Sequence, residues 1–441
     1  MKLNDIEAVI RKSDYTLKEK EIKEKTEKIQ QQISSGVDFS KFTVSTLTQG
    51  KKKRKIYQYS DDSIEKFMCS YLSRELAIYF KVKYANRNKM LIELFDKLKV
   101  INDLNDFVIV RCDFKSFFDS VPTNFIFQNY IESSNINREN KKYIEDFSNT
   151  LDYCRAGISL CNILTELPCR EFDKKLTAIM KNFGIIFYGR YVDDFLIITN
   201  KYISEDKVKE VINGVIKEAF KDCEKVMLND TKFVYISRRN LSLEQQSVKY
   251  FDFLGYKISI SNDNSEKKRK IDIKYGITTD KMDKYKRQFN KLIKEYQKNG
   301  NLELLRQRTK FYACRIVTHL NSSNSKPIWI ARGIVSNYSE LTNYINYLDL
   351  DTESFFKKCI NDIYKRNNVK AYFIQNNTDY NAYNLYANFA NKRSIIFDPK
   401  IGVKEKTLRN WIYKIDGEEY KPASYREVMF HYLNEMKIGK Q

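Results

Sequence analysis

Histidine is scarce in this sequence. Of its 441 residues only two, His319 and His431, are histidines, and the eight cysteines form no Cys-x-x-Cys pair. Both shortages argue against a zinc site and against a histidine-based catalytic triad, because such sites need imidazole groups or paired thiolates. Metal chemistry would have to come from carboxylates, whose oxygen atoms favour Mg²⁺, with Mn²⁺ as the second choice. The cysteines are expected to be reduced core residues.

Long apolar runs and flexible linkers are missing as well. No stretch of 18 consecutive apolar residues occurs, and the opening segment "MKLNDIEAVIRKSDY" lacks the apolar core of a signal peptide. Five prolines and few Gly/Ser clusters leave no obvious linker. We therefore expect a cytoplasmic protein without a membrane partner.

Negative charge is in deficit. The chain has 78 Lys and Arg residues against 57 Asp and Glu residues, a formal net charge of +21. A surplus of this size indicates a polyanionic partner, with nucleic acid the first candidate. The length allows two or three domains.

Three aspartates stand at the ends of apolar segments. In "FYGRYVDDFLIIT" (187–199), Asp193 and Asp194 lie between two apolar runs, a pattern that predicts a hairpin with both aspartates at its turn. The run "DFVIVRCDF" (106–114) predicts a buried strand that ends on Asp113. If these strands are neighbours in an antiparallel sheet, the three carboxylates converge.

Converging carboxylates repel one another unless something positive lies on them. Two divalent cations about 3.5–4 Å apart would neutralise them, and such a pair carries out in-line nucleotidyl transfer. The simpler alternative is an exposed Asp-Asp turn with no chemical role.

The remaining chain has a coarse pattern of helices and strands. The expected elements are a hairpin at 42–59 with the basic residues Lys51 to Lys55 at its tip, mainly helices at 123–183, helices at 205–222 and 279–298, strands at 226–236 and 250–260, and mostly helices at 300–441.

Five motifs in this order resemble those of the reverse transcriptases, over about residues 40–300. They are "RCDFKSFFDSVP" (111–122), "RAGISLCNILTEL" (155–167), "YGRYVDDFLIIT" (188–199), "VMLNDTKFVYI" (226–236) and "FDFLGYKI" (251–258). The resemblance implies an α+β fold, namely a right-hand polymerase with fingers, a palm with an antiparallel sheet, a thumb and a mainly α-helical C-terminal region. The implied domains are 1–260 (fingers and palm), 261–320 (thumb) and 321–441 (helical module).

The resemblance also implies roles for single residues. Asp113 and Asp193 would be the main metal ligands, Asp194 a weaker one, and Lys232 would stabilise or protonate the leaving pyrophosphate. Asp119 is expected to cap the helix that follows it.

Nucleotide and primer contacts are implied in the same way. The expected nucleotide-binding residues are Arg54 and Lys55 on the triphosphate, Phe118 against a ribose 2′-hydroxyl, and Gly157, which lets the backbone approach the nucleotide. Of the adjacent Phe117 and Phe118, one should be buried and the other exposed. The expected primer grip is Phe253, Leu254, Gly255 and Tyr256.

The middle motif departs from the common pattern. Ala156-Gly157 and Cys161-Asn162 stand where reverse transcriptases usually have Gln-Gly and Ser-Pro, which puts template handling in question more than metal chemistry. No integrase, RNase H or His-Asn-His motif follows the thumb. In these respects the chain resembles the bacterial antiphage reverse transcriptases, the abortive-infection and defence-associated "unknown group" classes.

The resemblance therefore implies an RNA-directed DNA polymerase that adds dNTPs in antiphage defence. Its expected partners are dNTPs, a structured non-coding RNA that serves as template, and product DNA. Three alternatives stay open: a template-independent, protein-primed DNA polymerase of abortive infection, an RNA-dependent RNA polymerase, and an inactive nucleic-acid-binding protein. The C-terminal module could bind RNA, form a homo-oligomer, or do both.

Overall fold

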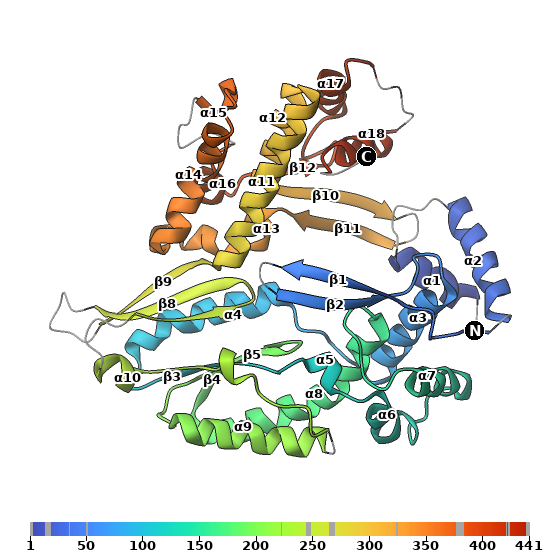
Figure 1. The fold of residues 1–441 in the computed structure, drawn as a ribbon, viewed down its shortest axis with the longest axis vertical. Coiled ribbons are helices and arrows are strands. Elements are labelled where there is room, and N and C mark those ends of the chain that lie inside the picture. Colours follow the sequence, from blue (N-terminus) through green and yellow to red (C-terminus); the bar gives the residue numbers. More distant parts are fainter. Residues whose placement is uncertain are drawn as a thin grey trace. The chain divides into compact units, whose positions relative to one another are not determined.

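The computed structural model contains helices and mainly antiparallel sheets (Figure 1). It describes residues 3–13, 19–34, 36–49, 52–221, 223–243, 248–263, 270–322, 325–375, 383–419, 421 and 424–437. The chain divides into two compact units, Met1–Ser247 and Val248–Gln441. The mixed α and β class expected from the sequence is confirmed, whereas the three functional domains remain a prediction. Among the helices of the described residues, none combines the length and apolar character that a membrane crossing requires.

The first unit contains two sheets and most of the longer helices. Its elements are α1 (Leu3–Ser13), α2 (Glu19–Ser34), β1 (Thr43–Gln49), β2 (Lys52–Gln58), α3 (Ile64–Tyr79), α4 (Arg87–Val100), β3 (Val108–Asp113), α5 (Phe117–Ser120), α6 (Thr123–Ile126), α7 (Arg138–Thr150), α8 (Ser159–Met180), β4 (Ile185–Tyr191), β5 (Asp194–Thr199), α9 (Glu205–Phe220), β6 (Val234–Ser237) and α10 (Arg238–Leu243).

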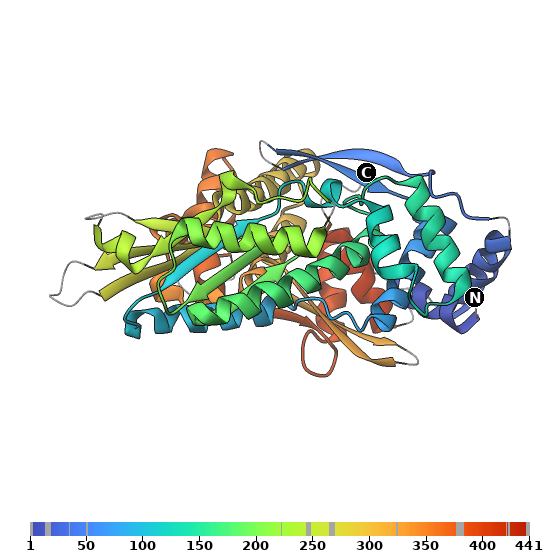
Figure 2. The ribbon, with the colours of Figure 1, turned by 90° about the horizontal axis from the view of Figure 1, so that it is seen from below.

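The four-stranded sheet of this unit has the order β4-β5-β3-β6, and all its neighbours are antiparallel. Helices α8 and α9 lie along one face (Figure 2), where Phe172 of α8 packs against Phe195 of β5 with ring centroids 5.4 Å apart. On the opposite face, α4 approaches β4 so closely that a Cβ on Gly189 would lie 2.9 Å from Met90. The apolar runs of the strands are therefore enclosed on both faces.

The hairpin predicted for residues 42–59 is present as β1 and β2, paired from Thr43↔Gln58 to Gln49↔Lys52. Lys51, at its predicted tip, lies outside the described residues. The strand predicted at 226–236 is mostly wrong, because β6 begins only at Val234. The preceding residues form a loop and a short 3₁₀ turn, Asp230–Lys232.

The second unit has two three-stranded sheets among helices. Its elements are β7 (Lys249–Phe253), β8 (Tyr256–Asp263), β9 (Lys270–Ile277), α11 (Thr279–Asn299), α12 (Leu302–Ala313), β10 (Arg315–Ser322), β11 (Ser325–Arg332), α13 (Ile334–Asn337), α14 (Leu350–Arg366), α15 (Tyr372–Gln375), α16 (Leu385–Ala390), β12 (Ser394–Phe397), α17 (Glu405–Asp416) and α18 (Tyr425–Glu435).

The C-terminal region is less purely helical than the sequence indicated. Strands β10 and β11 form a hairpin, and β12 adds to β10 in parallel. An apolar core joins this sheet to the helices around it: Ile316 and Phe397 pack with Leu408 of α17 and Tyr432 of α18. The region is thus a compact mixed structure built around a sheet.

Candidate active site

The three predicted aspartates meet at one end of the four-stranded sheet. Asp113, the last residue of β3, is the direct partner of Asp194, the first residue of β5. Asp193 precedes it in the β4–β5 turn, and its carbonyl accepts the backbone N–H of Phe114 at 3.0 Å. Directly opposed residues of an antiparallel pair point to the same face. The pairing therefore places the side chains of Asp113 and Asp194 on the face opposite α8 and α9.

Burial is the main influence on the pKa of two carboxylates in the cluster. Burial raises the pKa of Asp194 to about 6, although Arg111 opposes the shift. Burial and then repulsion from Asp113 also raise the pKa of Asp193. Asp194 Oδ1 is buried, and its contact with Arg111 Nε at 3.0 Å is an ion pair. A divalent cation beside these carboxylates would favour their charged forms and so lower the pKa of both Asp193 and Asp194.

Arg111 is a member of the site that the sequence analysis missed. Its Nε lies 3.0 Å from Asp194 Oδ1, its Nη2 lies 3.6 Å from Asp113 Oδ2, and its Nη1 donates to the carbonyl of Lys232 at 2.9 Å. It stands two residues before Asp113 in β3, so the period of a strand puts both on one face. A charged residue within the apolar run "DFVIVRCDF" was the available signal.

Lys232 also lies in the cluster. Its Nζ donates to Asp113 Oδ2, and its side chain is 30% exposed. In this position it neutralises a carboxylate, and its predicted contact with a leaving pyrophosphate stays a prediction.

The basic hairpin sends one side chain toward the aspartates. Arg54 is close enough to Asp193 that its charge counts among the influences that lower the pKa of this carboxyl. Lys55 follows Arg54 in β2, and successive side chains of a strand point to opposite faces. Of the two predicted triphosphate ligands, Arg54 is the one whose charge acts on Asp193, and its contact with a triphosphate stays a prediction.

Gly157 holds the hairpin close to the middle motif. The N–H of Tyr57 in β2 donates to the carbonyl of Ala156 at 3.0 Å, and Gly157 has φ +105°. A Cβ on Gly157 would lie 2.5 Å from the carbonyl oxygen of Tyr57. The close backbone approach that glycine allows here is made by the chain's own hairpin, and a nucleotide contact stays a prediction.

The two adjacent phenylalanines have different surroundings. Phe117 is 3% exposed and stacks on Phe114 at 5.0 Å, whereas Phe118 is only partly buried. The expectation of a buried ring is confirmed for Phe117, whereas the expected exposure of its neighbour is not, because Phe118 packs partly buried against the core. The predicted capping role of Asp119 is wrong, because α6 has Pro122 at its N-cap and Asp119 pairs with Arg155 at 2.7 Å.

The predicted primer grip forms the β7–β8 turn of the second unit. Phe253 and Tyr256 are almost completely buried in that unit. Leu254 and Gly255 make the turn, with φ of +50° and +85°. Any contact from this segment to a primer would therefore come from Leu254 and Gly255.

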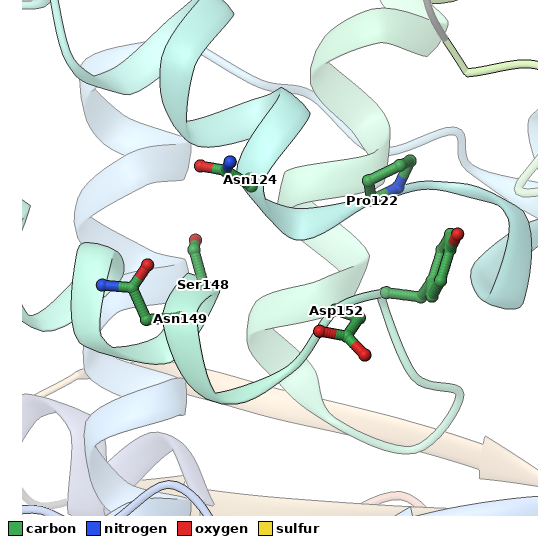
Figure 3. A pocket seen from close by; sticks show the side chains of 6 residues that line it. Pro122, Asn124, Ser148, Asn149 and Asp152 are labelled. Carbon is green, nitrogen blue, oxygen red and sulfur yellow. The ribbon is translucent and has the colours of Figure 1, made fainter.

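A polar cleft of about 400 Å³ lies elsewhere in the first unit (Figure 3). It is lined by Pro122, Asn124, Ser148, Asn149, Asp152 and Tyr153. No residue predicted for catalysis or binding lines it, so it has no part in the site described above.

The case for metal binding by the aspartates rests on the type of donor atom, not on a preformed ion site. No group of three His, Cys, Asp or Glu side chains is arranged to hold an ion anywhere in the described part of the chain. Arg111 and Lys232 instead lie on the carboxylates. An oxygen-only donor set is the kind that Mg²⁺ and Mn²⁺ prefer, and metal binding by these aspartates stays a prediction.

The known proteins that resemble this chain are solved structures of low similarity. No protein-family model and no curated protein matches the chain. Among solved structures, telomerase from Candida tropicalis truncated from its C-terminal domain has a TM-score of 0.34 and 14% identity, with 54% of this chain and 55% of that chain covered.

Two further telomerase structures contain a fragment of telomeric RNA. That from Candida albicans has a TM-score of 0.38 and 11% identity, with 78% of this chain and 64% of that chain covered. That from Candida tropicalis has a TM-score of 0.35 and 14% identity, with 94% and 68% covered. The chain thus spans between 55% and 68% of the length of these structures. Scores below 0.5 do not establish a shared fold, so the functional argument rests on the site.

Proposed function

We propose that this chain is a nucleic-acid polymerase, specifically an RNA-directed DNA polymerase that extends a 3′-hydroxyl with dNTPs. The observation that carries the proposal is the meeting of Asp113 and Asp194 on paired strands, with Asp193 in the adjoining turn. Buried or partly buried carboxylates at one end of a sheet, with arginine and lysine around them, suit the binding of a triphosphate and its metal ions.

In this proposal Asp113 and Asp193 hold the divalent cations. When bound, Mg²⁺ would activate the attacking hydroxyl and stabilise charge on the transferring phosphoryl group. Asp194, already paired with Arg111 at 3.0 Å, acts mainly through that arginine. This makes Asp194 the weakest ligand of the three.

The cationic residues have separate tasks. Arg54 approaches the aspartates from the hairpin and would bind triphosphate oxygens, as guanidinium groups do in bidentate contacts. Lys232, whose Nζ donates to Asp113, would bind the leaving pyrophosphate and donate a proton to it from Nζ. Phe118, the more accessible of its pair, would exclude the ribose 2′-hydroxyl and so select dNTPs.

The wider architecture proposed is that of a right hand. The four-stranded sheet with α8 and α9 would be the palm and the β1–β2 hairpin part of the fingers, within residues 1–260. Residues 261–320 would be the thumb, and 321–441 the C-terminal module. The net charge of +21 supports a nucleic-acid partner, which we take to be a structured non-coding RNA. A role in bacterial antiphage defence is supported by the sequence resemblance alone.

Primer extension by the purified full chain tests the proposal. Reactions would contain a primed RNA template, each dNTP or rNTP, and Mg²⁺ or Mn²⁺, with a second series lacking template. We expect dNTP incorporation that depends on both template and metal. Efficient rNTP incorporation would favour the RNA polymerase alternative, and random DNA made without template would favour the protein-primed alternative. A folded, metal-loaded protein that incorporates no nucleotide would refute the proposal.

A further inference from the structure

The turn that carries Asp193 and Asp194 has an unfavourable backbone. Val192, the residue before Asp193, has φ +61°. A β-branched residue rarely adopts this left-handed conformation, and it persists only where the surroundings impose it. Val192 is 39% exposed, so packing around its own side chain is not a sufficient restraint.

Arg190 supplies a restraint from behind the sheet. Its Nη1 donates to the carbonyl of Val192 at 3.0 Å. Its partner in β5 is Phe195, which packs toward α8, so Arg190 lies on the face opposite the aspartates. The guanidinium side chain is 5% exposed. The buried Arg190 thus fixes the carbonyl of Val192, the residue that links the end of β4 to Asp193 and Asp194.

Arg190 is itself held by two carboxylates of α8. Its Nε and Nη2 donate to Asp173 at 2.7 and 2.9 Å, and its Nη2 and Nη1 donate to Glu166 at 2.7 and 3.1 Å. Tyr188 Oη donates to the same Asp173 oxygen as Nε. Seven residues, or two helical turns, separate Glu166 from Asp173, so both project from one face of α8. Planar bidentate pairs of this kind fix orientation as well as charge.

We propose that Arg190 is a positioning residue that holds the Val192 turn, and through it Asp193 and Asp194, in the shape that binds the metal ions. The inference rests on the proposed function and deepens it, because it names a residue that touches neither substrate nor metal. A competing explanation is that the ion pairs with Glu166 and Asp173 only stabilise the fold. The two explanations differ in the expected effect of substituting Val192, because only positioning of the aspartates depends on the backbone conformation of this turn.

The first measurement is Mn²⁺ binding by electron paramagnetic resonance, combined with steady-state incorporation. Arg190→Lys keeps the positive charge but removes the planar guanidinium group, which donates to Glu166, Asp173 and the carbonyl of Val192. We expect at least tenfold weaker Mn²⁺ binding, about a hundredfold lower kcat, and a dNTP KM within threefold of wild type. Arg409→Lys, in the part-buried pair with Glu405 on α17, is the matched control and should change none of these.

The second measurement uses Val192→Gly, because glycine adopts positive φ without strain. In the Arg190→Lys background this change should restore Mn²⁺ affinity at least fivefold and slow hydrogen exchange across 188–196. A purely stabilising role for Arg190 predicts no recovery. Wild-type Mn²⁺ binding in Arg190→Lys, or no recovery with Val192→Gly, would overturn the inference.

The outcomes also separate this inference from the proposed function. A wild-type chain that binds Mn²⁺ without extending primers would refute the polymerase and leave the positioning test intact. A wild-type chain that binds no Mn²⁺ would refute both. Arg190→Lys is preferred to Arg190→Gln because an uncharged side chain would leave Glu166 and Asp173 buried without a cation.

Discussion

At the scale of single residues, the site is a balance between carboxylates and the cations that this chain supplies. Arg111 and Lys232 reach Asp113, and Arg111 also reaches Asp194. Lys232 and Arg54 act on Asp193 through their charge and lower its pKa, but burial and Asp113 outweigh them and raise it. Asp193 is therefore the residue at which an added divalent cation should matter most.

A metal-dependent stability shift follows from this imbalance. Mg²⁺ at about 100 times its Kd should stabilise the folded chain by about 2.7 kcal/mol. Asp193→Asn removes a repulsive charge, so without metal it should melt at or above the wild-type temperature, and added Mg²⁺ should raise that temperature much less. Thermal melting with and without Mg²⁺ measures both effects. An equal Mg²⁺ shift in wild type and variant would show that Asp193 binds no metal.

The two phenylalanines should respond differently to truncation. Phe117→Ala opens a cavity in the core and should cost about 3–5 kcal/mol of stability. Phe118→Ala should cost less and let rNTPs compete with dNTPs. Denaturant unfolding and competitive incorporation measure the two effects. If Phe117→Ala admits rNTPs and Phe118→Ala does not, the sugar contact has been assigned to the wrong ring.

At the scale of elements, the β1–β2 hairpin is positioned by one glycine. Gly157→Ala would force a residue with a Cβ into φ +105° and within 2.5 Å of the Tyr57 carbonyl. We expect a loss of about 2 kcal/mol or more and a raised KM for dNTPs, because Arg54 is carried by the same hairpin. Denaturant unfolding and steady-state kinetics test this expectation.

Gly214→Ala is the matched control for this prediction. Gly214 lies in α9 with nothing within 4 Å of an added Cβ, so alanine should stabilise the helix by about 0.5–1 kcal/mol. If Gly157→Ala were as harmless as Gly214→Ala, the hairpin would not depend on this contact.

The elements of the site could be predicted because their signals are local. Two apolar runs on either side of Asp193 and Asp194 specified β4 and β5, and the run to Asp113 specified β3. Arg111 was missed because its partners are identified only by the register of β3 and β5. The positioning role of Arg190 was missed for a related reason: its partners Glu166 and Asp173 lie on α8, and only the packing of this helix on the sheet brings them together.

The C-terminal sheet shows where local patterns fail. Strand β12 spans only Ser394–Phe397 and pairs in parallel with β10, about 80 residues earlier. A short apolar run such as "SIIF" is compatible with a helix or a strand, and only the distant partner decides. The local pattern was also insufficient at 226–236, where a loop and a short turn precede the strand that begins at Val234.

At the scale of the whole molecule, the two compact units predict where the chain can be cut. Among the described residues, the apolar core around α8 and α9 draws on those between Ile6 and Tyr235. Leu304, in contrast, packs with Leu408 and Tyr432. A fragment ending at Ser247 should therefore melt cooperatively, whereas one ending at residue 305 should expose apolar surface and bind a hydrophobic dye. Equal dye binding by the two fragments would contradict this division.

The central claim is that the three aspartates form a metal-dependent site for nucleotidyl transfer. The most direct measurement is the rate of dNTP incorporation by Asp193→Asn in Mg²⁺, beside wild type and the exposed control Asp206→Asn on α9. Loss of one metal ligand should lower the rate by about 10³-fold or more in a folded protein, and Asp206→Asn should leave it unchanged. Near-normal incorporation by folded Asp193→Asn would contradict the account.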